Sequence, residues 1–457
     1  MSVFGKKLCL KLKRKRLDSS ANTIIAYDKR SRDNDKEHQQ DNHGQRSSAY
    51  TSVEHFSHQG ENKQSSLPCY CGLVNDANNC YISCIIQALR LSTHFVAIIN
   101  TVYDSFSKDE LLNNTSSHWK SSTLIQLRKL IHEMQIREQA KEIKSITPIH
   151  LDEFLTSVWN NSQSFLPNSQ HDAHEFLHFM LKYLEDGCKL TANETLQSNF
   201  ASIFKGTLLF KTRCLECENA HEKKESFHDI SLSLDSTTTI DTVKLSSLLE
   251  KFTTVDYLDG VNKYYCEHCR NYTEAEIGIV FDEIPKVLIF HLKRLTSFDA
   301  YGYNRKIMTS VVTCTELVLD QCALCSNGCK ARNETYQLSA IIVHTGMSGS
   351  SGHYYSYVRV LNPDQQQRQD TSSSTTIDSN GNLGMPNASS SSSTSSPPIN
   401  LSDSKVTSRS VNMLAPMWIL FNDTVVKWVN SEQLLNILEP KGLSNSSTAY
   451  ILIYTQI

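Results

Sequence analysis

The chain has 457 residues, and its 45 Lys or Arg against 48 Asp or Glu give a formal net charge of only −3. This balance argues against a general polyanion-binding protein. No stretch approaches the roughly 18 consecutive apolar residues that a membrane helix needs. The basic start of the chain does not read as a secretory signal. We therefore expect neither a membrane protein nor a secreted one, and no membrane partner.

Residues 1–67 are expected to form a disordered basic and polar tail. Residues 1–17 carry seven basic side chains and no acidic one, and the segment that follows has few large apolar groups. Such a segment buries too little apolar surface to offset the entropy of ordering it. The basic cluster is typical of a nuclear import signal or a nucleic-acid patch, with a solvated charge run as the equal alternative. We expect a nuclear and/or cytoplasmic protein, and the cluster favours the nucleus.

Beyond the tail, helical patterns come first and strand patterns later. Apolar residues recur with spacing i, i+3, i+4, i+7 in three segments, which predict helices that include Ile82, Leu151 and Ala173. A low-complexity segment at about 363–410 is predicted to be a disordered insertion within a domain. Alternating or β-branched runs predict strands at 230–234, 287–290, 337–343, 354–360, 418–421 and 450–454. Helices followed by strands indicate an α+β fold.

Cys80 lies where the segment Gly72–Tyr81 enters the first predicted helix. A cysteine in the first turn of a helix lies at the positive end of the helix dipole, which favours the thiolate. The small and amide-bearing residues before it, Asn75 among them, place hydrogen-bond donors near a developing oxyanion. On this segment alone, a buried structural cysteine that starts a helix is an equal alternative.

Two later segments contain partners for such a thiolate. His353 lies between a glycine and a predicted strand, and Asn422 and Asp423 follow the strand at 418–421. A lone histidine is more often structural than catalytic. The order Cys, His, Asn/Asp along the chain is nevertheless that of papain-like thiol hydrolases.

Two cysteine pairs, Cys214-x-x-Cys217 and Cys266-x-x-Cys269, predict a structural zinc site. Two such pairs supply four thiolates, the ligand set of a tetrahedral zinc ribbon. The alternative is two pairs of free thiols. No catalytic cofactor is expected. A further metal site, which lacks a second clean pair, is left open at Cys322, Cys325 and Cys329, with Cys314 upstream.

The Gly72–Tyr81 segment resembles the cysteine box of the ubiquitin-specific proteases, a family of cysteine deubiquitinases of the peptidase C19 type. Gly352–Tyr354 and Trp418–Asp423 resemble its histidine box, Gln170–Leu177 resembles its Gln-Gln-Asp box, and Phe290–Arg294 matches another family strand. The matches follow the family order from about residue 70 to the C-terminus. The resemblance implies a papain-like α+β catalytic domain over 68–457. Its expected parts are a thumb at about 68–200, zinc-bearing fingers at about 201–280 and a palm at about 281–457.

The resemblance also implies the reaction, which is hydrolysis of the peptide or isopeptide bond after the C-terminal glycine of ubiquitin. Carried over to this sequence, Cys80 is the nucleophile and His353 the general base. Asn422 orients the imidazole, with Asp423 as an auxiliary orienting residue. The side-chain amide of Asn75 would donate to the oxyanion.

The substrate contacts that the resemblance implies come from the Gln-Gln-Asp box. Asp172 and Glu175 would pair with arginines of the ubiquitin tail, because carboxylates bind guanidinium groups through charge-assisted hydrogen bonds. For Asp172 a helix-cap role is the alternative, and both can hold. Ubiquitin and ubiquitinated proteins are the expected partners.

Three residues depart from the family pattern, because Ala77, Asn79 and Ser83 stand where Gly, Thr and Asn are usual. A catalytically impaired ubiquitin-binding module is therefore one alternative function. A zinc-dependent nucleic-acid-binding protein that uses the basic tail is another, against which the net charge of −3 argues. Within the family, the tail and the stretch 344–353 resemble a nuclear branch associated with DNA repair. That branch implies a WD40-repeat activator.

Overall fold

The computed structural model of the chain describes residues 68–105, 118–140, 146–191, 193–234, 242–295, 305–320, 333–348, 351–360, 417–440 and 446–457. The predicted tail 1–67, the predicted insertion at about 363–410, and Cys322, Cys325 and Cys329 lie outside these residues. Contacts between residues join the described parts of 68–258 and 264–457 into one compact body. The short segment Asp259–Lys263 is not assigned to that body.

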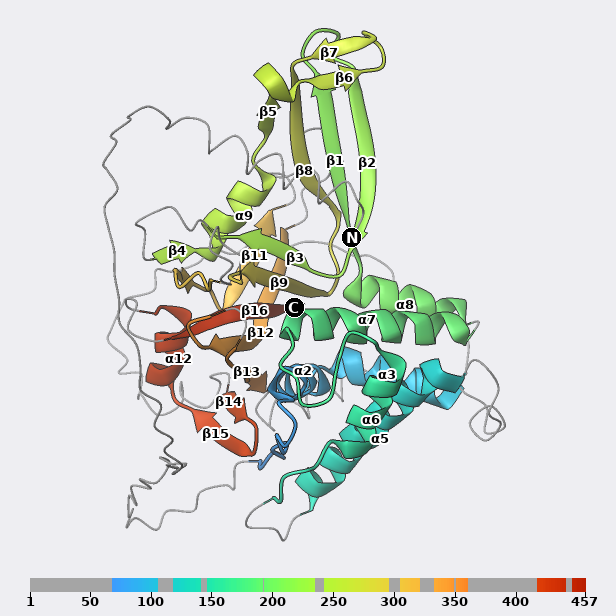
Figure 1. Ribbon diagram of the computed structural model, residues 1–457, viewed down its shortest axis with the longest axis vertical. Coiled ribbons are helices and arrows are strands. Elements are labelled where there is room, and N and C mark those ends of the chain that lie inside the picture. The colour runs from blue at the N-terminus through green and yellow to red at the C-terminus, as the bar shows by residue number, and fades with distance from the viewer. Residues whose placement is uncertain are drawn as a thin grey trace, which may run out of the picture. The chain divides into compact units, whose positions relative to one another are not determined.

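Helices occupy the first half of this body (Figure 1). They are α2 (Cys80–Arg90), α3 (Thr93–Ser105), α5 (His118–Gln139), α6 (Asp152–Asn161), α7 (Ala173–Leu190) and α8 (Glu194–Phe204). The three helices predicted from periodicity are α2, α6 and α7. All residues of α2 are buried, because this helix packs against α7 and also against strands β12 (Asn333–Thr345) and β13 (His353–Val360).

No single described helix has both the length and the apolar character that crossing a membrane requires. Helices α2 and α3 meet that test only as a pair, and the pair is bent by 95°.

The second half is built on a large sheet with strand order β15-β14-β13-β12-β16-β9-β3, and β11 pairs with β12 beside it. Its other strands are β3 (Ile230–Ser233), β9 (Val287–Lys293), β11 (Glu316–Asp320), β14 (Met417–Asn422), β15 (Val425–Val429) and β16 (Ser447–Gln456). Each of the six predicted strand segments forms part of this sheet. In the antiparallel pair β13–β14, Ser356 lies opposite Phe421. This register brings the start of β13 and the end of β14 to the same end of the sheet.

Both faces of the large sheet are buried. Along β16, Ile451 and Ile453 pack into the apolar core shared with the helices, whereas Leu452 and Tyr454 pack into the core on the opposite face. Successive side chains of a strand point to opposite faces. A sheet covered on both sides therefore needs apolar residues at every position, which explains the unbroken apolar runs in the sequence.

A second, four-stranded sheet has the order β2-β1-β8-β5. Figure 1 shows β1, β2 and β8 side by side and extending away from the large sheet, with the hairpin of β6 and β7 at their far end. The strands are β1 (Gly206–Cys214), β2 (Ala220–Phe227), β5 (Asp256–Leu258), β6 (Tyr264–Cys266), β7 (Asn271–Thr273) and β8 (Ala275–Glu283).

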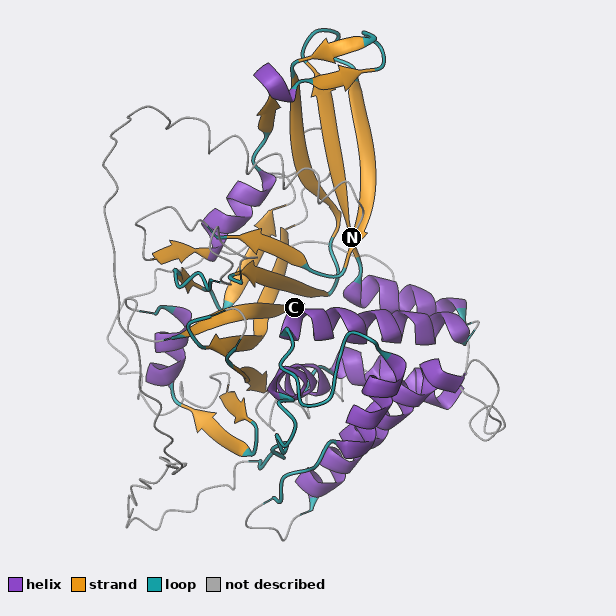
Figure 2. Cartoon of the chain, in the orientation of Figure 1, coloured by secondary structure: helices purple, strands orange, loops and turns teal. Residues whose placement is uncertain are grey.

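The remaining elements are short. Strand β4 (Thr242–Lys244) pairs with β10 (Ser310–Val312). Helices α9 (Leu245–Thr253) and α12 (Ser431–Leu438) contribute to the core on the face of the large sheet that the first helices do not cover, and Gly260–Asn262 forms a 3-10 turn. Figure 2 shows the segregation of helices and strands that the predicted α+β class requires. The exact limits of the thumb, fingers and palm stay a prediction.

Candidate active site

Cys80 is the first residue of α2, and its side chain is almost fully buried. The loop before it is held by its own polar groups, since the backbone N–H of Asn79 donates to Oδ1 of Asn75 at 2.9 Å. Asn78 takes the left-handed conformation with φ of 54°, which Asn tolerates better than most residues. The loop thus turns sharply into the helix and places the sulfur at its positive end.

His353 and Asn422 lie together where β13 begins and β14 ends. The His353 Nε2–H donates to Asn422 Oδ1 at 2.6 Å. A hydrogen bond at Nε2 fixes the tautomer and leaves Nδ1 as the ring nitrogen available to Cys80. The structure thus brings together Cys80 from the helical half and His353 and Asn422 from the sheet, as the sequence predicted them to meet.

Asp423 follows Asn422 in the β14–β15 turn and takes a left-handed conformation with φ of 51°. The strand has therefore ended, and the alternation that would point Asp423 away from His353 no longer applies. Its Oδ2 lies 3.8 Å from His353 Nε2 and accepts a hydrogen bond from Asn75 Nδ2 at 3.0 Å. Asn75 thus bridges the backbone before Cys80 and the carboxylate beside His353.

The environment of His353 favours its protonated form. A hydrogen bond with Cys80 raises the pKa of His353 to about 9, and the hydrogen bond to Asn422 and the charges of Cys80 and Asp423 act in the same direction against burial. An imidazole with this pKa stays protonated at neutral pH. The arrangement therefore places a protonated imidazole beside the Cys80 sulfur, where it can donate a proton to a leaving group.

Asp172 and Glu175 occupy different positions at the start of α7. Asp172 is the N-cap residue, because its Oδ1 accepts from the backbone N–H of His174 at 2.8 Å, and its Oδ2 accepts from Tyr450 OH at 2.6 Å. The helix-cap alternative for Asp172 is therefore confirmed. Glu175 is exposed in the first turn and free to meet a ligand from solvent.

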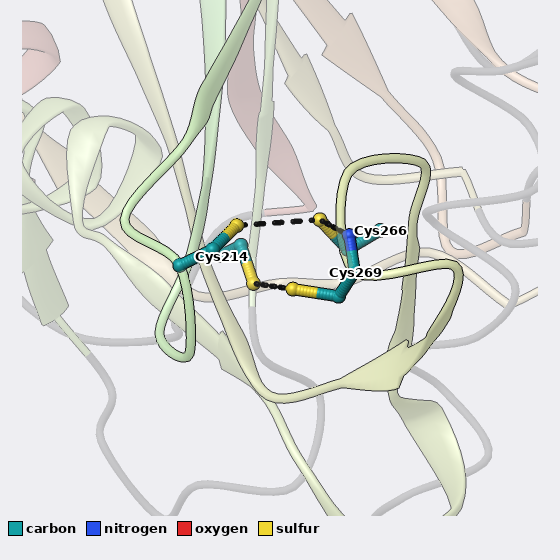
Figure 3. Close-up of side chains that lie close together, drawn as sticks. Cys214, Cys266 and Cys269 are labelled. Atoms are coloured by element: carbon teal, nitrogen blue, oxygen red, sulfur yellow. Dashed lines mark hydrogen bonds between the residues drawn. The ribbon is translucent and has the colours of Figure 1, made fainter.

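The four cysteines predicted to bind zinc converge at the far end of the four-stranded sheet. Figure 3 shows Cys214 on one chain segment and Cys266 and Cys269 on another, with their sulfurs directed toward each other. Cys214 Sγ lies 3.9 Å from Cys269 Sγ, and Cys217 Sγ lies 3.6 Å from Cys266 Sγ. A zinc ion about 2.3 Å from four tetrahedral sulfurs spaces them by about 3.8 Å, so the sulfurs fit a single ion.

The backbone repeats the same turn after each cysteine pair. The residues that follow the second cysteine of each pair, Glu218 and Arg270, have φ of 57° and 53°. The Thr273 hydroxyl lies 3.2 Å from Cys214 Sγ and lowers the pKa of Cys214, whereas the neighbouring thiols raise the pKa values of Cys217 and Cys269. The first thiolate of the cluster therefore forms on Cys214, and a bound cation would favour deprotonation of the other three.

Residues 71–454 match the family model described as Ubiquitin carboxyl-terminal hydrolase. The chain belongs to this family. A Ubiquitin carboxyl-terminal hydrolase 12 from Salmo salar is 30% identical over 312 residues, which are 64% of this chain and 77% of that relative. A Ubiquitin carboxyl-terminal hydrolase 1 from Bos taurus is 35% identical over 179 residues, which are 35% of this chain and 22% of that relative. This chain is therefore a deubiquitinating hydrolase.

Solved structures confirm the fold of the hydrolase. The structure of the SAGA Ubp8/Sgf11/Sus1/Sgf73 DUB module bound to ubiquitin aldehyde aligns with a TM-score of 0.57 and 21% identity, over 85% of this chain and 69% of that one. A second structure of the module, bound to monoubiquitin, aligns with a TM-score of 0.56 and 21% identity, over 86% of this chain and 72% of that one. The predicted papain-like α+β class is thereby confirmed.

The departures from the family pattern leave Cys80 at the start of α2, but two of them bury a polar atom without a partner among the described residues. In the Gly72–Tyr81 loop the positive φ occurs at Asn78 and not at Ala77. Backbone conformation therefore does not require a glycine at position 77. Asn79 is buried; its Nδ2 donates to the Val74 carbonyl at 3.3 Å, whereas its Oδ1 has no hydrogen-bond partner among the described residues. The hydroxyl of Ser83 is buried without a hydrogen-bond partner among the described residues. None of the three displaces Cys80 from the start of α2.

Three residues near the site were not assigned a role from the sequence. Gln170 Oε1 accepts from the backbone N–H of Gly352 at 3.2 Å, next to His353. A Cβ at Gly352 would overlap His344, so only glycine fits there. Burial, followed by the charge of Lys306, lowers the pKa of His344 to about 4 and keeps it neutral. Gln170 lies in the segment that resembles the Gln-Gln-Asp box, but its partner Gly352 is 182 residues further along the chain, so the sequence does not indicate this contact.

Proposed function

We propose that this hydrolase is a cysteine-type ubiquitin-specific peptidase with Cys80 as nucleophile, His353 as general base and Asn422 as the orienting residue. The observation that carries the proposal is the hydrogen-bonded row of Cys80, His353 and Asn422, with 2.6 Å between His353 Nε2 and Asn422 Oδ1. Its substrate bond is the peptide or isopeptide bond after the C-terminal glycine of ubiquitin.

The reaction begins with the thiolate of Cys80 attacking the carbonyl carbon of that glycine. The His353 imidazolium then gives its proton to the leaving amine, and a thioester remains on Cys80. His353, now neutral, removes a proton from water, whose attack on the thioester releases the ubiquitin carboxylate. None of these steps needs a cofactor.

The oxyanion of each step is stabilised by backbone amides at the start of α2 and by the Asn75 side chain. Asn75 Nδ2 donates to Asp423 Oδ2 at 3.0 Å, and its Oδ1 accepts from Asn79. Both ends of the side-chain amide are therefore held before substrate binds. Asp423 acts as a positioning residue through Asn75 and as an auxiliary charge beside His353.

The proposed ubiquitin contacts lie at the start of α7. Glu175 is exposed and pairs with an arginine of the ubiquitin tail through charge-assisted hydrogen bonds. Asp172 adds a carboxylate next to it, and its hydrogen bond from Tyr450 OH at 2.6 Å holds it in place.

The zinc part of the proposal assigns one structural ion to Cys214, Cys217, Cys266 and Cys269. Bound zinc would supply four bonds that join the β1–β2 and β6–β7 turns, and none of the chemistry at Cys80 passes through it. A nuclear location and a WD40-repeat activator also belong to the proposal, and both rest on the resemblance stated for the tail and for residues 344–353.

The decisive experiment is labelling with a ubiquitin probe that carries an electrophile in place of its C-terminal carboxylate. We expect one ubiquitin added per chain on Cys80, and no addition to Cys80→Ala. In the same preparation Cys80→Ala should not hydrolyse a fluorogenic ubiquitin conjugate but should still bind ubiquitin. Binding by the unsubstituted chain without labelling would favour the impaired ubiquitin-binding module. Salt-sensitive DNA binding that needs residues 1–17 would favour the nucleic-acid-binding alternative.

A further inference from the structure

A group of histidines lies on α7, on strand β9 and beside β3, and the proposed reaction does not use it. The α7 sequence His174-Glu175-Phe176-Leu177-His178 has the form H-E-x-x-H. Residues four apart share one face of a helix. Two histidines spaced in this way present their ring nitrogens to the same point, which is how H-E-x-x-H helices bind zinc.

An aspartate bridges these two histidines. Asp229 lies between β2 and β3. Its Oδ2 accepts a hydrogen bond from His174 Nε2 at 2.9 Å, and its Oδ1 accepts one from His178 Nε2 at 2.5 Å. Its side chain is 7% exposed, that of His174 is 11% exposed and that of His178 is 45% exposed. A buried carboxylate therefore lies between two imidazoles, and the site opens to solvent on the His178 side.

A third histidine, His291 of β9, completes the group. Its ring stacks on that of His174 with 3.7 Å between ring centroids. One ring nitrogen each of His174 and His291 and one carboxylate oxygen of Asp229 all lie within 4.8 Å of one another, and His178 is linked to these three through Asp229. Ser231 Oγ lies 3.0 Å from His291 Nδ1 and 3.4 Å from Asp229 Oδ2, so one hydroxyl supports both.

The ligand types are those of a borderline divalent metal. Imidazole nitrogen and carboxylate oxygen in a 2:1 or 3:1 ratio are typical of zinc sites and of related transition-metal sites. A metal-binding histidine usually hydrogen-bonds through its other nitrogen, and Ser231 offers such a partner to His291. The half-exposed His178 marks a path by which an ion enters.

Hydrogen bonding alone accounts for only part of this arrangement. It explains the contacts of His174 and His178 with Asp229, but His291 is 9% exposed and its Nε2 is buried with no hydrogen-bond partner in the described chain. An unpartnered buried polar atom is costly. A small rotation of the His291 ring in this group would offer a nitrogen to a bound cation.

We propose that His174, Asp229 and His291 form a second metal site, which binds Zn²⁺ and is separate from the four-cysteine cluster, and that His178 joins it from the exposed side as a fourth ligand. The cation takes the place of the protons between the two Nε2 atoms and the carboxylate. A neutral ring then carries its single proton on Nδ1, and a protonated ring releases its second proton to solvent. Bound zinc joins α7 to the β3–β9 edge of the sheet, just behind the first turn that contains Glu175.

The test counts zinc in the full chain after loading with Zn²⁺ and removal of free metal. We expect about two zinc ions per chain, and about one in His178→Ala, a half-exposed position whose loss leaves the core intact. The matched control is His150→Ala, which removes an exposed histidine bonded to Asp76 at 3.1 Å and should retain two. Asp229→Asn should also retain one. Equal zinc content in His178→Ala and the unsubstituted chain would overturn the proposal.

Cobalt distinguishes this site from a second cysteine site. After loading with Co²⁺, the spectrum of the chain minus that of His178→Ala should contain weak d–d bands only, because a nitrogen and oxygen site gives no sulfur-to-cobalt charge transfer. Cys325→Ser should leave the zinc content unchanged. A charge-transfer band in the difference spectrum, or one zinc lost in Cys325→Ser, would assign the second ion to cysteines and refute the histidine site.

Discussion

Replacing Asn422 and Asp423 separately by alanine tests how the imidazole of His353 is oriented. Asn422 Oδ1 lies 2.6 Å from His353 Nε2, within hydrogen-bonding distance, whereas Asp423 Oδ2 lies 3.8 Å away. The first contact is directional and fixes the ring. The second acts through charge alone. We therefore expect Asn422→Ala to lower kcat more than Asp423→Ala, with little change in KM.

The distances set the expected magnitudes. A hydrogen bond to a charged group contributes about 1.5–3 kcal/mol, and about 1.4 kcal/mol corresponds to a tenfold change in rate. Loss of the Asn422 contact should therefore lower kcat by roughly 10- to 150-fold. The charge of Asp423 acts on a partly exposed imidazole, where an ion pair contributes about 0.2–1 kcal/mol. Loss of the Asp423 charge beside His353 should therefore lower kcat by roughly 1.5- to 5-fold.

The assay is steady-state hydrolysis of a fluorogenic ubiquitin conjugate, with thermal unfolding as the control for intact fold. Asn422→Asp should stay active, because a carboxylate oxygen also accepts from Nε2. The double variant Asn75→Ala with Asp423→Ala should lose less activity than the sum of the two single losses, since Asp423 also acts by holding Asn75 at 3.0 Å. A larger loss in Asp423→Ala than in Asn422→Ala would refute the assignment and make Asp423 the orienting residue.

Three further predictions concern pH, zinc and the tail. The interactions that raise the pKa of His353 from 6.5 to about 9, chiefly the one with Cys80, stabilise the folded chain. Their contribution to the free energy of unfolding is complete below about pH 6.5. That contribution is lost as pH rises through about 9, so Cys80→Ala should lower the His353 pKa in an NMR titration and flatten the pH dependence of unfolding. Removing zinc from Cys214, Cys217, Cys266 and Cys269 should speed hydrogen exchange in β6 and β7, and unchanged exchange after chelation would contradict a structural ion there. Deleting residues 1–17 should reduce nuclear enrichment in cells without changing turnover in vitro, whereas unaltered enrichment would leave only the solvated-charge interpretation.

Local patterns in the sequence were sufficient for the fold class. The spacing of apolar residues around Ile82, Leu151 and Ala173 identifies three of the helices, because each forms a stripe that repeats within the helix itself. Helix α5 was missed, although its buried residues Leu124, Leu127, Ile131 and Met134 recur every three or four positions. The complete burial of α2 could not be predicted from its periodicity either, because it depends on strands more than 240 residues further along the chain.

The residue types of the candidate site could be predicted, but not the contacts between them. Cys80, His353 and Asn422 are identified by short motifs, each of which is local. The hydrogen bond from Asn75 to Asp423 joins residues 348 apart in the sequence. It requires the strand to end at Asn422 and Asp423 to take a positive φ, and strand periodicity predicts the opposite orientation for that side chain.

The alignment of Cys80 with His353 depends on contacts between the two halves of the body, because neither half contains both residues. Leu73 N–H donates to the Asp423 carbonyl at 2.9 Å. A Cβ on Gly72 would lie 2.6 Å from the carbonyl oxygen of Thr424, so only glycine allows this close approach. These contacts fix the turn that presents Asn422 and Asp423 against the segment that leads to Cys80. The glycine of the cysteine motif is thus explained by how closely helices and sheet meet, and the distance between nucleophile and base is set at this junction.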